Sequence, residues 1–269
     1  MKSLAILISL ILSLSSFSQA LEAIIIVSHV KNDIKDDLKE GSWYLNSVAL
    51  AEKQSEFFKS KGVIVHKFYG DSAIWKNIVK VAPNCSFFIY MGHGGRYNPL
   101  CLTREKPLIY KDNTTKLDKE FWYDNIDTNR IKEMKLKKNS IAILSGVCFA
   151  SGSSASDKSE ITKEEAKKRT EHYINTFFKC GASAYFSNNY LESPYKLLVS
   201  LYEGKTISNF TDNRIIHGKY DKEEFNEIYN NNKSFKYLLY SLKYKNDPVD
   251  FYSCVCSNPN FSINTIKSK

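Results

Sequence analysis

The stretch CSFFIYMGHGG, residues 85–95, joins a short apolar run to a glycine-rich turn that carries a histidine. The run 85–91 is almost entirely apolar, which is typical of a strand buried on both faces. It stops at Gly92, and the two glycines after His93 leave bare backbone beside the imidazole. This pattern predicts a central strand of a parallel sheet, with His93 just beyond its carboxyl end.

The rest of the chain alternates between further apolar runs and segments with helical periodicity. With 85–91 included, the predicted strands cover residues 23–30, 63–68, 85–91, 140–149, 181–187 and 249–256. Helices are predicted over residues 43–61, 72–82, 162–179 and 193–202, in a segment that ends at Lys138, and near 233–244. This alternation predicts an α/β fold, a three-layer sandwich in which a mainly parallel sheet carries helices on both faces.

The first twenty residues, MKSLAILISLILSLSSFSQA, have the features of a secretory signal peptide. Lys2 precedes a short apolar stretch, and the small residues before the mature chain predict cleavage near Ala20. We therefore expect residues 1–20 to be removed and residues 21–269 to form a single domain of a secreted, periplasmic or otherwise extracytoplasmic protein. No later segment is long and apolar enough to predict a membrane span in the mature chain.

The composition narrows the classes of partner and cofactor. The formal net charge is +9, but the lysines alternate with acidic residues along predicted helices, as in EEAKKR at 164–169. Without a basic stripe, we expect no binding to nucleic acid. The six cysteines are too few for a disulfide scaffold in a chain of this length, and their spacings match no metal-ligand pattern. We therefore expect neither a metal nor another cofactor.

A second strand end carries a nucleophile. The apolar run from residue 140 leads to Cys148, which small residues follow. Ligands gather at the carboxyl ends of parallel strands, so Cys148 and His93 meet if their strands are neighbours. An imidazole there can take the thiol proton and later protonate a leaving amine, which is the chemistry of acyl transfer. The N–H groups of Gly94 and Cys148 are the candidate oxyanion hole.

The motifs YMGHGG and ILSGVCFASG resemble those of the caspase-like (clan CD) cysteine peptidases, which include caspases, legumain, gingipains, clostripain and the GPI-anchor transamidase subunit. The resemblance covers about residues 24–208, and the segment from Gly181 adds a third similar motif. The separation between His93 and Cys148 is close to the roughly 50 residues seen in caspases. The resemblance implies a caspase-like fold and a peptide or protein substrate, with Cys148 as nucleophile, His93 as general acid/base and Gly94 in the oxyanion hole.

Two further positions are predicted to contact substrate. Gly146 occupies the place, two residues before the nucleophile, where several members of the superfamily have a polar or acidic residue that helps to set specificity. Ser151 belongs to the serine-rich loop 150–160, which can line a cleft beside Cys148 or simply connect two elements. The aromatic residues at 121–123 favour core packing over a subsite wall.

Two other functions compete with a peptidase that acts through a thioester. A catalytically inactive caspase-fold binding protein is the main alternative, and a disulfide at Cys148 would favour it because a bridged sulfur cannot attack a carbonyl. A serine hydrolase that uses Ser145 or Ser151 is disfavoured, since no G-x-S-x-G pattern follows the strand that begins at residue 140.

Overall fold

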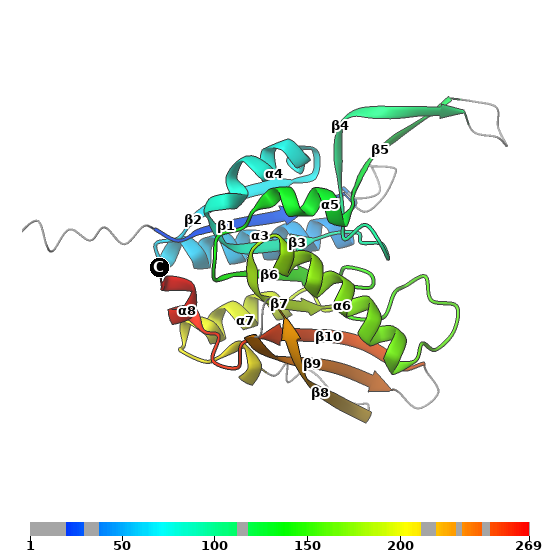
Figure 1. Ribbon diagram of the computed structural model, residues 1–269. Coiled ribbons are helices and arrows are strands. Elements are labelled where there is room, and N and C mark those ends of the chain that lie inside the picture. Colours follow the sequence, from blue (N-terminus) through cyan, green and yellow to red (C-terminus); the bar gives the residue numbers. More distant parts are fainter. Residues whose placement is uncertain are drawn as a thin grey trace, which may run out of the picture.

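The computed structural model describes residues 20–29, 38–111, 118–210, 219–229, 233–243 and 248–268 (Figure 1). The predicted signal peptide lies outside these residues apart from Ala20. A central eight-stranded sheet has the strand order β2-β1-β3-β6-β7-β10-β9-β8, and a separate two-stranded sheet pairs β4 with β5.

Five neighbouring strands of the central sheet run parallel. They are β2 (Ile64–Tyr69), β1 (Glu22–Val27), β3 (Cys85–Met91), β6 (Ser140–Ser145) and β7 (Ala182–Asn188). Three antiparallel strands extend the sheet beyond β7, namely β10 (Asp250–Ser257), β9 (Lys233–Lys243) and β8 (Lys219–Tyr229). The mainly parallel sheet that the sequence predicts is therefore confirmed.

Helices cover both faces of this sheet and form two outer layers (Figure 1). On one face lie α3 (Trp43–Ser60), α7 (Ser193–Tyr202) and α8 (Ile263–Lys267), and on the other lie α4 (Trp75–Val81) and α6 (Lys163–Lys179). Strand β1 shows why both faces need a cover. Its Ile24 and Ile26 lie in the core under α4 and α6, and its Ile25 and Val27 lie in the core under α3 and α7. Alternate side chains of a strand point to opposite faces, so a uniformly apolar strand builds two cores at once.

Short helical turns complete the described chain. They are α5 (Thr128–Ile131) and the 3₁₀ turns η1 (Gly70–Ser72), η2 (Ala82–Asn84), η3 (Lys132–Met134) and η4 (Ile207–Asn209). No helix among the described residues combines the length and the apolar character needed to cross a bilayer.

The segment before β6 differs from the prediction. A helix ending at Lys138 was expected, but only the single turns α5 and η3 form there. The preceding residues make a long hairpin of β4 (Leu100–Lys111) and β5 (Asp118–Ile126), which extends away from the central sheet (Figure 1). The hairpin escapes prediction because its strands are rich in charged residues and its register is irregular between Thr103 and Leu108.

The predicted helix near 233–244 is also wrong, because this segment is strand β9. Its apolar run alternates between the two cores: Phe235, Tyr237 and Leu239 face one, and Leu238 and Tyr240 face the other. A short continuous apolar run has no periodicity that separates a buried strand from a buried helix. Pairing with β10 and β8 therefore settles its conformation.

Strand β6 ends at Ser145, four residues earlier than predicted. Gly146 has a φ of 64°, a left-handed conformation that interrupts the strand and suits glycine. Cys148 consequently lies in a tight turn beyond the sheet and not within the strand itself. This turn is the structural element that presents the thiol.

Candidate active site

The strands that precede His93 and Cys148 are direct neighbours in the sheet. Strands β3 and β6 are parallel, and Met91 at the end of β3 pairs with Ser145 at the end of β6. Both turns therefore leave the same edge of the sheet, which is the condition that the sequence left open. The two candidate catalytic residues follow within three residues of these paired positions.

The backbone of His93 is anchored from below while its side chain is exposed. The buried hydroxyl of Tyr90 donates to the carbonyl oxygen of His93 at 2.6 Å, and it accepts from the N–H of Cys101 on β4 at 3.0 Å. The ring of Tyr123 lies edge-on to the imidazole, with 6.4 Å between ring centroids. Tyr123 is itself buried, so it packs in the core and also borders the imidazole.

Tyr123 is the one residue of the aromatic group 121–123 whose position can be compared with the prediction. The side chains of Phe121 and Trp122 lie outside the described part of the structure.

Gly94 is needed where it lies because the turn of Cys148 packs directly on it. A Cβ added to Gly94 would lie 2.4 Å from Cγ1 of Val147, 2.6 Å from Oη of Tyr173 and 3.0 Å from the carbonyl oxygen of Cys148. From the sequence, Gly94 is expected to leave bare backbone beside the imidazole. On this side of its α-carbon, the turn that carries the thiol fills the space beside that backbone.

A buried tyrosine of α6 joins the two turns. The Tyr173 hydroxyl lies 2.9 Å from the carbonyl oxygens of both Gly95 and Cys148, and its single proton is shared between these two acceptors. Burial raises the pKa of Tyr173 well above its ordinary range, so the hydroxyl keeps its proton and remains a donor. Sequence reasoning missed this residue, because its only signal was its place on the apolar stripe of a predicted helix.

The backbone amides of the two turns differ in their hydrogen bonding. In the part of the chain that the structure describes, the amides of Gly95, Gly146 and Phe149 each donate to a carbonyl oxygen. The amides of Gly94 and Cys148 have no such acceptor among the described residues. Unpaired N–H groups at the edge of a sheet are what an oxyanion hole requires.

Cys148 also differs from the other five cysteines in its exposure. All six are free thiols, but Cys148 is half-buried while the rest are buried. Burial raises the pKa of Cys85, Cys101 and Cys180 to about 12, and it raises the pKa of Cys254 further. Since the thiolate is the reactive form and must be reached from solvent, Cys148 is the thiol most open to chemistry.

The residues after Cys148 form a rigid turn. The amide of Phe149 donates to Ser153, and the carbonyl oxygen of Ala150 accepts from the hydroxyls of Tyr185 and Ser187 at 2.8 and 2.7 Å. Ser151, which was predicted to contact substrate, is buried, and its hydroxyl donates to that of Ser187 at 3.1 Å. The structure therefore gives Ser151 a role in holding the turn from within.

A pocket of about 370 Å³ opens directly beside the thiol. Its lining includes Trp43, Gly146, Cys148, Ser153, Asn189 and Asp250. Gly146 lines this pocket, and its predicted contact with substrate stays a prediction. The indole of Trp43 packs so closely over Gly146 that an added Cβ would lie 2.7 Å from the ring. Trp43, Asn189 and Asp250 were not predicted, because three separate elements bring them to this edge.

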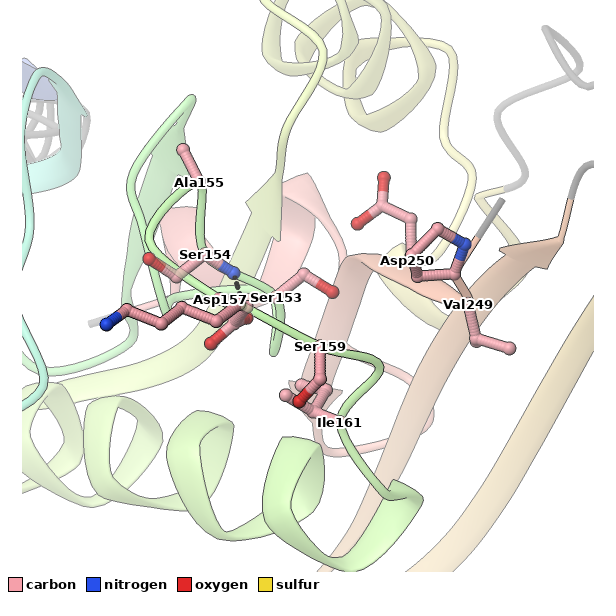
Figure 2. Close-up of a pocket in the computed structure, with 10 residues that line it drawn as sticks. Ser153, Ser154, Ala155, Asp157, Ser159, Ile161, Val249 and Asp250 are labelled. Atoms are coloured by element: carbon pink, nitrogen blue, oxygen red, sulfur yellow. Dashed lines mark hydrogen bonds between the residues drawn. The ribbon is translucent and has the colours of Figure 1, made fainter. Parts of the chain in front are cut away.

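Asp250 supplies a carboxylate to this pocket. Figure 2 shows the adjoining pocket of about 360 Å³, in which the loop from Ser153 to Ser159 lies across from Asp250 at the start of β10. Partial burial raises the pKa of Asp250, and a hydrogen bond from the Ser153 hydroxyl opposes that rise. No Lys or Arg within the described ranges forms an ion pair with Asp250, so this carboxylate has no cationic partner there.

Comparison with known proteins adds no family to these observations. No protein-family model matches the chain, and no curated protein matches it.

Proposed function

We propose that this chain is a caspase-like cysteine peptidase that acts through a thioester on Cys148, with His93 as the general acid/base. The observation that carries the proposal is the contact of one Tyr173 hydroxyl, at 2.9 Å, with carbonyl oxygens of both turns. This contact holds the turn of the imidazole against the turn of the one half-exposed thiol. The three-layer α/β architecture agrees with a caspase-like fold and with the resemblance of the two motifs.

The chemistry uses groups that lie at one sheet edge. His93 takes the proton of the Cys148 thiol, and the sulfur attacks the peptide carbonyl carbon. The carbonyl oxygen becomes an anion that accepts hydrogen bonds from the free amides of Gly94 and Cys148, each of which contributes roughly 3 kcal/mol. The imidazolium then protonates the leaving amine. Water, activated by the same imidazole, hydrolyses the thioester and restores the thiol.

The pocket beside Cys148 favours a basic side chain on the acylated residue. The carboxylate of Asp250 is partly removed from water and has no cationic partner among the described residues, so a bound lysine or arginine would supply the missing charge. The aromatic face of Trp43 forms one wall, and such a face also attracts a guanidinium or ammonium group. We therefore expect cleavage after Arg or Lys.

Labelling with a peptidyl ketone that alkylates active-site thiols, carrying arginine next to the reactive carbon, tests the mechanism. Wild type should be labelled once, at Cys148, and both Cys148→Ala and His93→Ala should lose labelling while keeping their thermal unfolding midpoints. Cys101→Ala, which removes a buried thiol, is the matched control and should label like wild type. Equal labelling of Cys148→Ala would remove this residue from the mechanism.

The same experiment separates the inactive alternative. A binding protein with this fold would take up the arginine peptide but would not turn it over, so saturable binding with no product and no thiol adduct would favour that function.

A further inference from the structure

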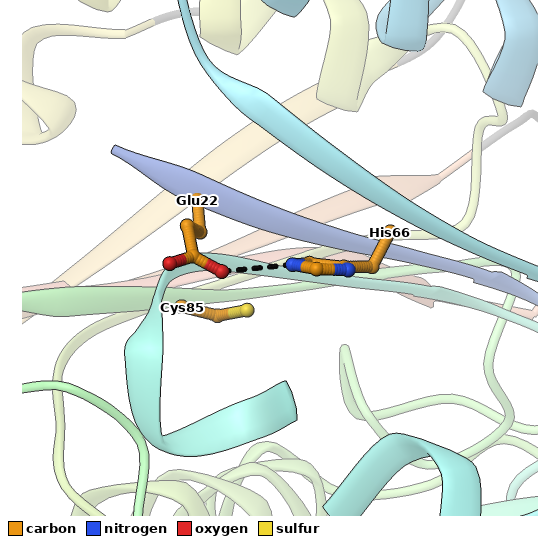
Figure 3. A group of neighbouring side chains, drawn as sticks. All are labelled: Glu22, His66 and Cys85. Atoms are coloured by element: carbon orange, nitrogen blue, oxygen red, sulfur yellow. Dashed lines mark hydrogen bonds and ion pairs between the residues drawn. The ribbon is translucent and has the colours of Figure 1, made fainter. Parts of the chain in front are cut away.

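Three side chains from neighbouring strands meet at the end of the sheet opposite to Cys148. Glu22 is the first residue of β1, Cys85 is the first residue of β3, and the two are paired across the strands. His66 on β2 pairs with Ile24, two residues along β1 from Glu22. Because positions two apart in a strand share a face, the three side chains point to the same side of the sheet (Figure 3).

The distances suit joint coordination of one ion. One ligand atom from each residue lies within 4.8 Å of the others, and Nε2 of His66 is 2.8 Å from Oε2 of Glu22. Bonds of about 2.0–2.3 Å to a tetrahedral zinc ion place ligand atoms roughly 3.3–3.8 Å apart. Side-chain adjustments of about an ångström would therefore bring all three atoms to bonding distance.

We propose that Glu22, His66 and Cys85 form a binding site for a zinc ion. The set combines one oxygen, one nitrogen and one sulfur ligand, which zinc accepts and which calcium and magnesium do not. The thiol of Cys85 donates to the carbonyl oxygen of Val81 at 3.3 Å. On binding, its proton leaves to solvent and the thiolate takes the metal.

The site is open enough to load and leaves room for a further ligand. The side chains of Glu22 and His66 are 15% and 27% exposed, whereas Cys85 is buried. An ion can thus enter from the solvent side, with the sulfur beneath it, and three protein ligands leave the fourth position to water. Sequence patterns for metal sites could not identify these three residues, because such patterns use short spacings. Glu22, His66 and Cys85 lie on three different strands that come together only in the sheet.

Cobalt titration in a Cys148→Ala background tests the proposal, since that variant removes the half-exposed thiol, which could otherwise bind cobalt itself. A thiolate ligand gives cobalt a charge-transfer absorption in the near ultraviolet. We expect one equivalent to bind with this band, zinc to displace it, and a zinc concentration one hundred-fold above Kd to raise Tm by roughly 5–10 °C.

Variants identify the ligands. Cys85→Ser should lose the charge-transfer band, and His66→Gln should weaken cobalt binding at least tenfold. Cys180→Ser removes another buried thiol and is the control, so it should change neither the band nor the affinity. Absence of the band in the parent, its survival in Cys85→Ser, or a Tm that zinc does not move would overturn the proposal and leave an ordinary His66–Glu22 ion pair. Should Cys85→Ser fail to fold, the His66→Gln variant alone decides, since His66 is partly exposed and its replacement is less disruptive. These readouts do not involve peptidase activity, so the site stands or falls separately from the proposed function.

Discussion

Replacing Asp250 with asparagine tests whether its carboxylate selects a basic substrate side chain. The substitution keeps the size of the residue and removes one negative charge from a pocket that adjoins the Cys148 thiol. If a lysine or arginine of the substrate pairs with this carboxylate, the variant loses that attraction in the transition state for acylation. The loss should appear for basic substrates and not for neutral ones of the same shape.

The magnitude follows from the partial burial of Asp250. Two unit charges about 4 Å apart interact by about 4 kcal/mol at the effective dielectric constant of roughly 20 found near protein surfaces. Solvent reaches this half-buried carboxylate, which lowers the figure, so we take about 2–4 kcal/mol. This range corresponds to a decrease in kcat/KM between roughly 30-fold and 1,000-fold.

The assay compares two peptide substrates that differ only at the residue before the scissile bond, arginine in one and its uncharged isostere citrulline in the other. Asp250→Asn should lower kcat/KM for arginine by the stated factor and change the value for citrulline by less than about threefold. Glu56→Gln, which removes an exposed carboxylate elsewhere on α3, is the charge-matched control and should change neither.

A parallel decrease in kcat/KM for both substrates would contradict charge selection by Asp250, because it would mean that this residue supports the fold of the site instead. A wild-type enzyme that cleaves the citrulline peptide as well as the arginine peptide would refute it equally.

Four other outcomes are expected. Gly94→Ala should lose activity and about 1–3 kcal/mol of unfolding free energy, measured by denaturant titration, because its new Cβ overlaps Val147. Gly95→Ala is the control: its new Cβ would lie 3.7 Å from the nearest atom, so it should lose neither activity nor stability. Tyr173→Phe should cost about 1–2 kcal/mol and lower kcat more than it changes KM, because it unties the two turns; an unchanged kcat would contradict its positioning role. Alkylation followed by mass spectrometry should modify Cys148 alone in the native protein and the other five cysteines only after unfolding. Because burial raises the pKa of Asp250 above 3.8, its charge disfavours folding as pH rises through that raised value, so Asp250→Asn should unfold at neutral pH at an equal or higher temperature than wild type.

Local pattern was sufficient for the central strands. β3 was predicted with the bounds that the structure has, because its apolar run of seven residues lies between Pro83 and Gly92 and is too short for a typical helix. The helices α3, α6 and α7 were also predicted to within one or two residues, since apolar periodicity and capping residues such as Thr162 act over a single turn.

Local pattern failed where pairing partners decide the conformation. The apolar run of β9 suits a helix and a strand equally, and only β8 and β10 on either side make it a strand. The hairpin of β4 and β5 gave no signal because the charged residues of its strands show no alternation with apolar ones.

The amino-acid sequence alone shows that His93 and Cys148 each follow a buried strand. A buried strand and a glycine turn are each specified by a few neighbouring residues, so both can be recognised locally. Three further features depend on the folded arrangement: these strands are neighbours, Tyr173 joins their turns, and Asp250 lines the pocket. The antiparallel pairing of β10 with β7 brings the first residue of β10 to the edge where the parallel strands end. Whether these residues meet depends on the order and direction of the strands. Both are set by pairing between segments that are far apart in the sequence, so no local pattern shows them.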